Sequence, residues 1–126
     1  MGAPEPHSPG TTILLVDDDE MLRDVLARTL ADAGYPVLTA MDGDEALALV
    51  RALNGQLGLV VTDIRMPGMD GLELADNLAG LPTAPPVLFI SGYAEDHEVP
   101  GPYLAKPFLP SALVEQVARM VSASVQ

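Results

Sequence analysis

The side chains that could do chemistry each follow a short apolar run. Asp17 and Asp18 follow the first such run, and Asp63, Ser91 and Lys106 each follow or end a later one. Carboxylates that lie close together do not all ionise cheaply unless a cation shares them. Since the chain has no cysteine, oxygen atoms would be the ligands, which favours a hard ion such as Mg²⁺ or Mn²⁺. With a lysine and a serine hydroxyl opposite the ion, the arrangement suits a phosphoryl group.

The apolar runs are predicted to be buried strands. They are short, bounded by Gly, Pro or polar residues, and continuous rather than alternating in polarity, which is typical of a parallel sheet covered on both faces. Strands are expected at Ile13–Val16, Val37–Ala40, Leu59–Val61, Val87–Ile90 and Tyr103–Ala105. Helical spacing of apolar residues predicts helices over residues 21–30, 43–53, 72–78 and 111–121. Asp42 is expected to cap the second helix, and Gly34 and Gly80 to close the first and third.

Strands and helices alternate along the chain, which indicates a doubly wound α/β fold. Such folds bind ligands outside the carboxyl ends of their strands, so the polar residues named above would converge on one crevice. Lys106 supports this prediction, because it is the only lysine in the chain and directly follows a strand. Simpler explanations exist: Asp63 could begin a turn, the acids at 17–20 could offset a helix dipole, and Lys106 could be a surface cation.

The composition limits the partners of the chain. Its 126 residues are enough for one domain. With 18 acidic and six basic residues, the chain has a formal charge of −12. Such a charge repels nucleic acid and anionic membranes, so we expect no direct contact with either. Without cysteine, a transmembrane-length apolar run or a signal peptide, the chain is expected to be cytoplasmic. His7, in a Pro- and Gly-rich arm, and His97, among acids, are not expected to bind metal.

A set of motifs resembles the receiver domain of two-component response regulators. In chain order they are Val16-Asp17-Asp18-Asp19, Asp63-x-x-Met66-Pro67-x-Met69-Asp70-Gly71, Ser91-Gly92 and Tyr103-x-x-Lys106-Pro107-Phe108. The resemblance covers nearly the whole chain from about Thr12 onward. It implies a flavodoxin-like, doubly wound sheet of five parallel strands in the order 2-1-3-4-5. The expected division is a flexible arm or linker at 1–12, a receiver domain at 13–123 and a tail at 124–126.

By this resemblance Asp63 is the phosphoacceptor, which takes a phosphoryl group from a phosphohistidine on a histidine kinase or a phosphotransfer domain. Asp18, Asp63 and the backbone carbonyl of Arg65 would hold Mg²⁺ or Mn²⁺, with Asp17 assisting through water. The ion would neutralise charge on the transferring group. The resemblance thus implies a signalling phosphoacceptor that promotes its own phosphorylation and dephosphorylation, rather than an enzyme acting on other substrates.

The resemblance also assigns roles on the other side of the pocket. Ser91 and Lys106 would each contact a phosphoryl oxygen, and Tyr103 matches an aromatic switch that turns inward once Ser91 has moved. An aspartyl phosphate adds charge and strong acceptors beside these residues, which would draw in the loops that carry them. The Lys106-Pro107 peptide bond is expected to be cis, as is usual in the family.

The chain departs from the family pattern between Ser91 and Lys106, where receivers carry a full helix. Residues 95–99 leave room for about one turn before two prolines, so the fourth helix is expected to be shortened or absent. Leu109 stands where an Asp or Ser would usually cap the last helix, which predicts a weaker start. The proline-rich arm and the residues after Ser91 resemble receivers at the C-terminus of hybrid histidine kinases, so an origin in such a protein is expected.

Two other functions stay open. The chain could be a phosphate-independent interaction module with a receiver fold, although all the pocket residues are present. It could instead be a haloacid-dehalogenase-like phosphatase, because Asp17-x-Asp19 fits the first motif of that family superficially. That family needs an acidic pair after its lysine, whereas this chain has only Glu115 beyond Lys106, and Asp63 would then have no role.

Overall fold

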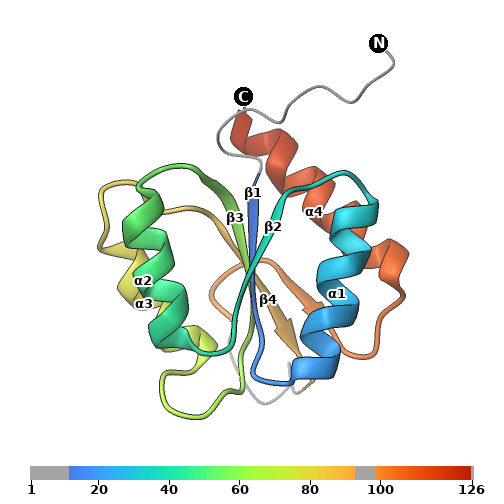
Figure 1. Ribbon diagram of the computed structural model, residues 1–126, viewed down its shortest axis with the longest axis horizontal. Coiled ribbons are helices and arrows are strands. Elements are labelled where there is room, and N and C mark those ends of the chain that lie inside the picture. The colour runs from blue at the N-terminus through green and yellow to red at the C-terminus, as the bar shows by residue number, and fades with distance from the viewer. Residues whose placement is uncertain (1–11, 93–98, 126) are drawn as a thin grey trace.

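The predicted strands form one parallel sheet in the computed structural model of the chain, which describes residues 12–92 and 99–125. The strands are β1 (Thr12–Val16), β2 (Val37–Ala40), β3 (Leu57–Asp63), β4 (Val87–Ser91) and β5 (Tyr103–Ala105). Their order across the sheet is β2-β1-β3-β4-β5, and every neighbouring pair is parallel (Figure 1). This is the predicted doubly wound, flavodoxin-like α/β fold, in which the strand order reverses between β1 and β3.

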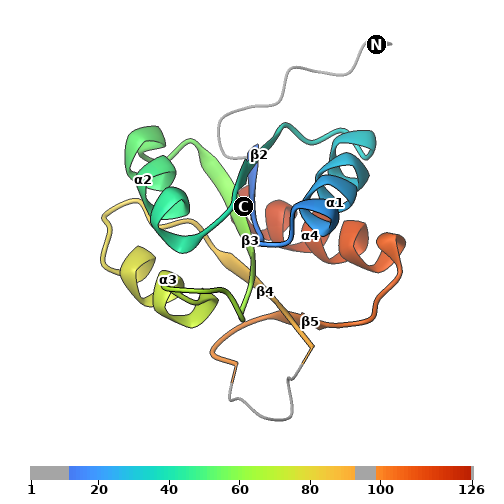
Figure 2. The same cartoon turned by 60° about the horizontal axis from the view of Figure 1, so that its bottom comes forward.

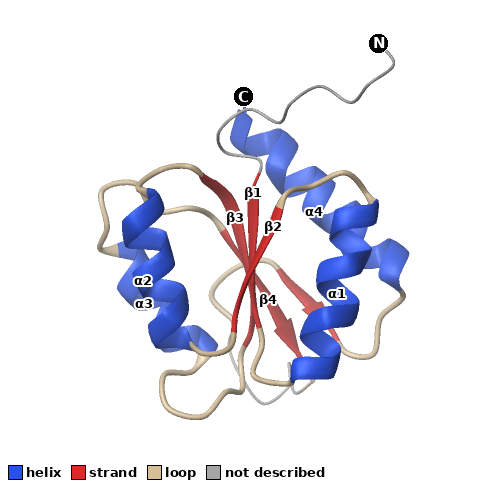
Figure 3. Ribbon diagram, viewed as in Figure 1, coloured by secondary structure: helices blue, strands red, loops and turns tan. Residues whose placement is uncertain are grey.

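Helices cover both faces of the sheet. They are α1 (Glu20–Asp32), α2 (Gly43–Leu53), α3 (Gly71–Ala79) and α4 (Pro110–Val125). Helices α1 and α4 lie on one face and α2 and α3 on the other, as Figures 1 and 2 show from two directions. Colouring by secondary structure separates the resulting layers of helix, sheet and helix (Figure 3). Because both faces are covered, the strands carry continuous apolar runs.

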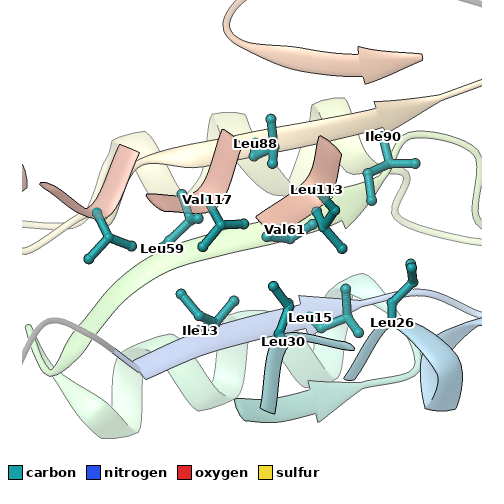
Figure 4. Packing of buried hydrophobic residues seen from close by; sticks show 11 residues of the cluster. Ile13, Leu15, Leu26, Leu30, Leu59, Val61, Leu88, Ile90, Leu113 and Val117 are labelled. Carbon is teal, nitrogen blue, oxygen red and sulfur yellow. The ribbon is translucent and has the colours of Figure 1, made fainter. Parts of the chain in front are cut away.

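Alternate strand residues belong to two separate cores. In β1, Ile13 and Leu15 pack in the core under α1 and α4, whereas Leu14 and Val16 pack in the core under α2 and α3. Figure 4 shows the first of these cores, in which the strand side chains meet Leu113 and other residues of the covering helices. Strand β3 contributes to both cores and is buried along its whole length.

Short polar residues and glycines set the helix ends. Asp19, Asp42 and Asp70 accept hydrogen bonds from first-turn backbone N–H groups of α1, α2 and α3 at 3.1, 2.8 and 2.8 Å. The predicted cap at Asp42 is thereby confirmed. Gly34 follows α1 with a φ of +103°, which glycine adopts without strain, and Gly80 caps α3. Both predicted helix ends are confirmed.

Several boundaries differ from the prediction. Strand β1 begins at Thr12, inside the predicted arm, because Thr12 pairs with Leu57 of β3. For the same reason β3 begins two residues before Leu59. Helix α4 begins at Pro110 and continues to Val125, beyond the predicted range of 111–121. The prediction rested on apolar spacing, which locates the buried part of a helix and not its exposed turns.

The predicted apolar face of α1 is only partly buried. Leu26 and Leu30 pack in the core, whereas Met21 is 80% exposed and Val25 is 56% exposed. Met21 lies in the first turn of α1, just beyond the carboxyl end of β1, and Val25 lies about one turn further along the helix. The spacing of apolar residues predicted the helix correctly but overestimated how much of it the core covers.

The connection between β4 and β5 is described only in part. Its described residues, 92 and 99–102, form no helix. The single turn predicted at 95–99 lies outside the described residues except for Val99. In the part of the chain that the structure describes, no helix has both the length and the apolar character needed to cross a bilayer.

Candidate functional site

Carboxylates from two neighbouring strands meet at the carboxyl edge of the sheet. Asp17 and Asp18 directly follow β1, and Asp63 is the last residue of β3. Because Val16 pairs with Thr62, the residues that come next in the two strands lie side by side. Each aspartate can offer one oxygen, and these oxygens lie within 4.8 Å of one another. Asp17 and Asp63 are buried, whereas Asp18 is exposed.

Ser91 and Lys106 lie at the same edge, on the other side of Asp63. Ser91 ends β4, and Lys106 follows β5, the next two strands of the sheet. The Lys106 Nζ lies 3.3 Å from Asp63 Oδ2, in an ion pair whose lysine side chain is 33% exposed and whose aspartate side chain is 11% exposed. The predicted cis bond between Lys106 and Pro107 is confirmed. The structure therefore brings together residues that are up to 89 positions apart, from Asp17 to Lys106 (106 − 17).

Asp63, Ser91 and Lys106 line a pocket of about 460 Å³ at the end of β3 and β4. Its lining residues are Asp63, Ile64, Arg65, Ser91, Gly92, Lys106 and Pro107. The lining offers the Asp63 carboxylate, the Lys106 ammonium group that pairs with it, and the buried Ser91. A small anion that shares a cation with the carboxylate would find hydrogen-bond donors in the ammonium group and the hydroxyl.

Burial raises the pKa of the two inner carboxyls. For Asp17 it raises the pKa to about 6, opposed by a hydrogen bond from the Asp19 backbone N–H at 2.9 Å and reinforced by the charge of Asp63. Burial also raises the pKa of Asp63, although the Lys106 ammonium opposes this shift. Ionising both carboxyls is therefore costly unless further positive charge is supplied nearby.

The donor set fits a hard divalent cation. Asp17, Asp18 and Asp63 offer only oxygen atoms, and a shared cation would offset the cost of ionising the two buried carboxyls. Arg65 lines the pocket directly after Asp63 and Ile64. No described contact assigns a role to its backbone carbonyl, so its part in metal binding stays a prediction.

Tyr103 lies apart from the pocket. It begins β5, an edge strand of the sheet, and is 48% exposed. It is not among the described residues that line the pocket. Its role as an aromatic switch stays a prediction.

Two residues to which the sequence analysis assigned no role shape the site. Arg23 of α1 donates from Nη1 to the backbone carbonyl of Asp17 at 2.8 Å. Gly71, at the start of α3, donates its N–H to the Ile64 carbonyl, and a β-carbon there would collide with the Asp63 carbonyl. The available signals were a cation near the start of a helix, where the dipole disfavours it, and a glycine that ends the receiver-like motif.

Fold and site together define a class, the flavodoxin-like α/β domains with an acidic pocket at the carboxyl edge of the sheet. Within this class, a sequence model of the response regulator receiver domain matches residues 13–118, and the chain belongs to that family. The chain is therefore a receiver domain of two-component signalling. The resemblance carried by the motifs is confirmed.

Curated relatives include a sensor kinase and transcriptional regulators. The chain is 36% identical over 121 residues to the sensor kinase CckA of Brucella abortus. This alignment covers 90% of the chain and 13% of the kinase. It is 40% identical over 125 residues to the C4-dicarboxylate transport transcriptional regulatory protein DctD of Pseudomonas aeruginosa. This alignment covers 90% of the chain and 26% of the regulator. The chain spans between 13% and 51% of the length of the curated relatives compared.

Solved structures match over the whole fold. The receiver domain of the hybrid histidine kinase CckA is 39% identical with a TM-score of 0.78, over 87% of this chain and 98% of that one. A CheY-like receiver domain protein from Methanospirillum hungatei JF-1 is 27% identical with a TM-score of 0.79, over 90% and 96% of the two chains. The two alignments therefore span nearly the full length of each solved receiver domain.

Proposed function

We propose that this receiver accepts a phosphoryl group on Asp63 from a phosphohistidine of a histidine kinase or a phosphotransfer domain. One observation carries the proposal: Asp63 Oδ2 lies 3.3 Å from the Nζ of the only lysine of the chain, beside two further carboxylates. Membership of the receiver family supports the assignment.

In the proposed transfer, a carboxylate oxygen of Asp63 forms a bond to phosphorus while the bond between phosphorus and the donor imidazole breaks. The imidazole leaves with the electron pair and takes up a proton from solvent. Lys106, which pairs with Asp63 before the reaction, would pair with a phosphoryl oxygen, and the Ser91 hydroxyl would donate to another. These groups are already near the acceptor, so positioning supplies much of the rate.

The carboxylates would supply the metal site for this step. Asp18, Asp63 and the Arg65 carbonyl would hold Mg²⁺ or Mn²⁺ directly, and Asp17 would assist through water. When bound, the ion supplies neutralising charge for the transferring group. Because the acceptor Asp63, Lys106, Ser91 and the metal-binding carboxylates all belong to the receiver, we propose that it promotes its own phosphorylation, including from a small-molecule donor, and its own dephosphorylation.

After transfer, the aspartyl phosphate would bring added negative charge to Ser91 and Lys106. We propose that Ser91 moves toward the phosphoryl oxygens and that Tyr103, now 48% exposed at the sheet edge, then turns inward. This change would alter the surface around β5 and signal the phosphorylated state to a downstream partner.

An apolar surface beside the pocket is the proposed contact for the phosphohistidine donor. We define the α1–Pro107 surface as a pocket of about 320 Å³ together with the exposed Met21. The pocket is lined by Leu22, Val25, Leu26, Lys106, Pro107, Phe108 and Pro110. Since Lys106 and Pro107 line both this pocket and the pocket of about 460 Å³ that contains Asp63, here called the phosphorylation pocket, a protein docked here would reach Asp63.

Further features of the chain remain proposals. We propose that the receiver unit predicted at 13–123 includes Thr12 and Val125 as well, since β1 begins at Thr12 and α4 ends at Val125, and that it belongs to a hybrid histidine kinase. We also propose a cytoplasmic location without contact to nucleic acid or membrane, because the formal charge of −12 disfavours both.

Intact-mass spectrometry after incubation with acetyl phosphate and Mg²⁺ tests the central proposal. The wild-type chain is expected to gain one phosphoryl group, and Asp63→Asn to gain none. EDTA should abolish the adduct. Asp76→Asn, an exposed aspartate of α3, is the matched control and should behave as wild type.

The same experiment separates the alternatives. Absence of an adduct on the wild-type chain would contradict the proposal and favour a phosphate-independent interaction module. An adduct that survives Asp63→Asn but is lost in Asp17→Asn would favour the phosphatase-like chemistry. Circular dichroism of each variant excludes loss of the fold as a trivial cause.

A further inference from the structure

Arg23 ties helix α1 to the loop that carries two of the acidic residues. Its guanidinium Nη1 donates to the backbone carbonyl oxygen of Asp17 at 2.8 Å. Its own backbone N–H donates to the Asp19 carbonyl, also at 2.8 Å, in the first turn of the helix. Arg23 therefore bonds both ends of the short segment between β1 and α1.

The dipole of α1 alone makes the position of Arg23 unfavourable for a positive charge. Arg23 lies about one turn from the N-terminal end of α1, where the helix dipole disfavours a positive charge. Among the described residues, its guanidinium forms no ion pair with a carboxylate and instead bonds to the main chain. The bond to Asp17 gives a physical reason for a cation at this place.

Asp17 is held at three points. Its backbone N–H donates to the Ala40 carbonyl at 3.1 Å, its side chain accepts from the Asp19 N–H at 2.9 Å, and its carbonyl accepts from Arg23. Asp17 is only 1% exposed, so its carbonyl needs a protein donor. Removal of the Arg23 side chain would take away the hydrogen bond to this carbonyl. It would also loosen the segment that holds Asp17 and Asp18 close to Asp63.

We propose that Arg23 is a positioning residue for the metal-binding carboxylates of this receiver. This inference rests on the proposed function, since it assumes that Asp17, Asp18 and Asp63 bind a divalent cation. Arg23 acts through the Asp17 main chain and does not touch the metal or the phosphoryl group. Loss of a partner that orients a metal ligand typically lowers metal affinity by about 10- to 100-fold.

The direction in which the Kd for Mg²⁺ changes when Arg23 is removed distinguishes a positioning role from a purely electrostatic one. A positive side chain near a cation site repels the cation, so if charge alone mattered, removing Arg23 would tighten Mg²⁺ binding. If Arg23 positions the carboxylates, removing it weakens Mg²⁺ binding although the site becomes more negative. The two explanations predict opposite changes in Kd.

The test is a calorimetric or NMR titration of the full chain with Mg²⁺ alone. Arg23→Met is expected to raise the Kd for Mg²⁺ by about 10-fold or more. Arg23→Lys, which can still donate to the carbonyl, should recover most of the affinity. Arg28→Met removes the same charge from an exposed position of the same helix and is the matched control, with a Kd near the wild-type value.

A Kd for Arg23→Met equal to or below the wild-type value would overturn this inference alone, because the wild-type metal site would stand. A wild-type chain that binds no Mg²⁺ would overturn the proposed metal site and this inference with it. If Arg23→Met is unfolded by circular dichroism, Arg23→Gln, which loses the same bond but keeps a polar end, decides by the same criterion.

Discussion

Gly71 lies directly against the backbone carbonyl of Asp63. A β-carbon at Gly71 would overlap that oxygen and would come within 2.9 Å of the Ile64 Cα. The Gly71 N–H also donates to the Ile64 carbonyl at 2.8 Å. The start of α3 is thus packed against the end of β3 with no room for a side chain, and any residue larger than glycine must displace the main chain of Asp63.

Gly71→Ala is therefore expected to lower the free energy of unfolding by about 1–3 kcal/mol, the usual cost of an overpacked site. It should also slow phosphoryl uptake from acetyl phosphate, because Asp63 moves relative to Lys106. Urea unfolding and a time course of intact mass measure the two effects. Gly80→Ala is the control, since an added β-carbon there meets its nearest atom at 3.7 Å. Equal behaviour of the two variants would contradict the prediction.

Lys106→Met removes the cation that holds down the pKa of Asp63. The pKa of Asp63 is expected to rise further above its ordinary value, since burial then acts without the opposing ammonium. Phosphoryl uptake should fall by about 100-fold, the typical loss for one stabilising donor. A ¹³C NMR titration of the aspartate carboxyls and the mass assay measure these changes. If Lys106→Met keeps wild-type uptake, the lysine has no role in the transfer.

The stability of the metal-free chain should depend on pH through Asp17. Folding raises its pKa from 3.8 to about 6, so between these values the folded chain binds more protons than the unfolded chain. The contribution of Asp17 to the free energy of unfolding therefore falls as pH rises from about 4 to about 6 and is then constant. The shift corresponds to about 3 kcal/mol at most. Urea unfolding in EDTA across this pH range measures the slope.

Asp17→Asn supplies the control for this prediction, because it removes the titrating group while leaving a side chain of nearly the same size. The variant should have a flatter pH dependence than the wild-type chain. Saturating Mg²⁺ should also flatten the wild-type curve, since a bound cation favours the ionised carboxylates. Parallel curves for the wild-type chain and Asp17→Asn would show that Asp17 does not titrate in this range.

If a donor protein docks on the α1–Pro107 surface, a change there should impair transfer from that protein but not labelling by a small-molecule donor. Met21→Glu should impair transfer from a phosphohistidine donor protein that labels the wild-type chain, because a charge replaces an apolar contact at the surface. Labelling by acetyl phosphate should remain as in wild type, since Met21 does not line the phosphorylation pocket. Leu38→Glu, on the edge strand β2, is the matched control. A parallel loss with both donors would place the defect in the pocket and not in docking.

Local patterns predicted the elements well, because the strand and helix signals lie within a few residues. The bounds of β2, β5 and α2 agree with the prediction, and Asp63 ends β3 as expected. Exposure depends on which side of a helix the neighbouring elements cover. Apolar spacing therefore did not reveal that Met21 and Val25 are exposed.

The site was predictable where chemistry itself selects the residue type. Carboxylates, a lone lysine and a serine after strands indicated one crevice, and the structure brings them to one edge of the sheet. Arg23 and Gly71 act through main-chain atoms, so their residue types carry no chemical signature of the pocket. Such contacts depend on how a loop folds back on a helix, which the spacing of residues does not encode.

Strand β3 is buried in all seven residues, whereas every residue of β5 is at least partly exposed. Amide hydrogens of β3 are therefore expected to exchange only when the whole domain opens, and those of β5 to exchange through local fluctuations. Mechanically, Asp63, the proposed phosphoacceptor, lies at the stiff centre of the sheet, and Lys106 follows the more compliant edge strand β5. A force between Asp63 and Lys106 would then displace β5 and leave β3 in place.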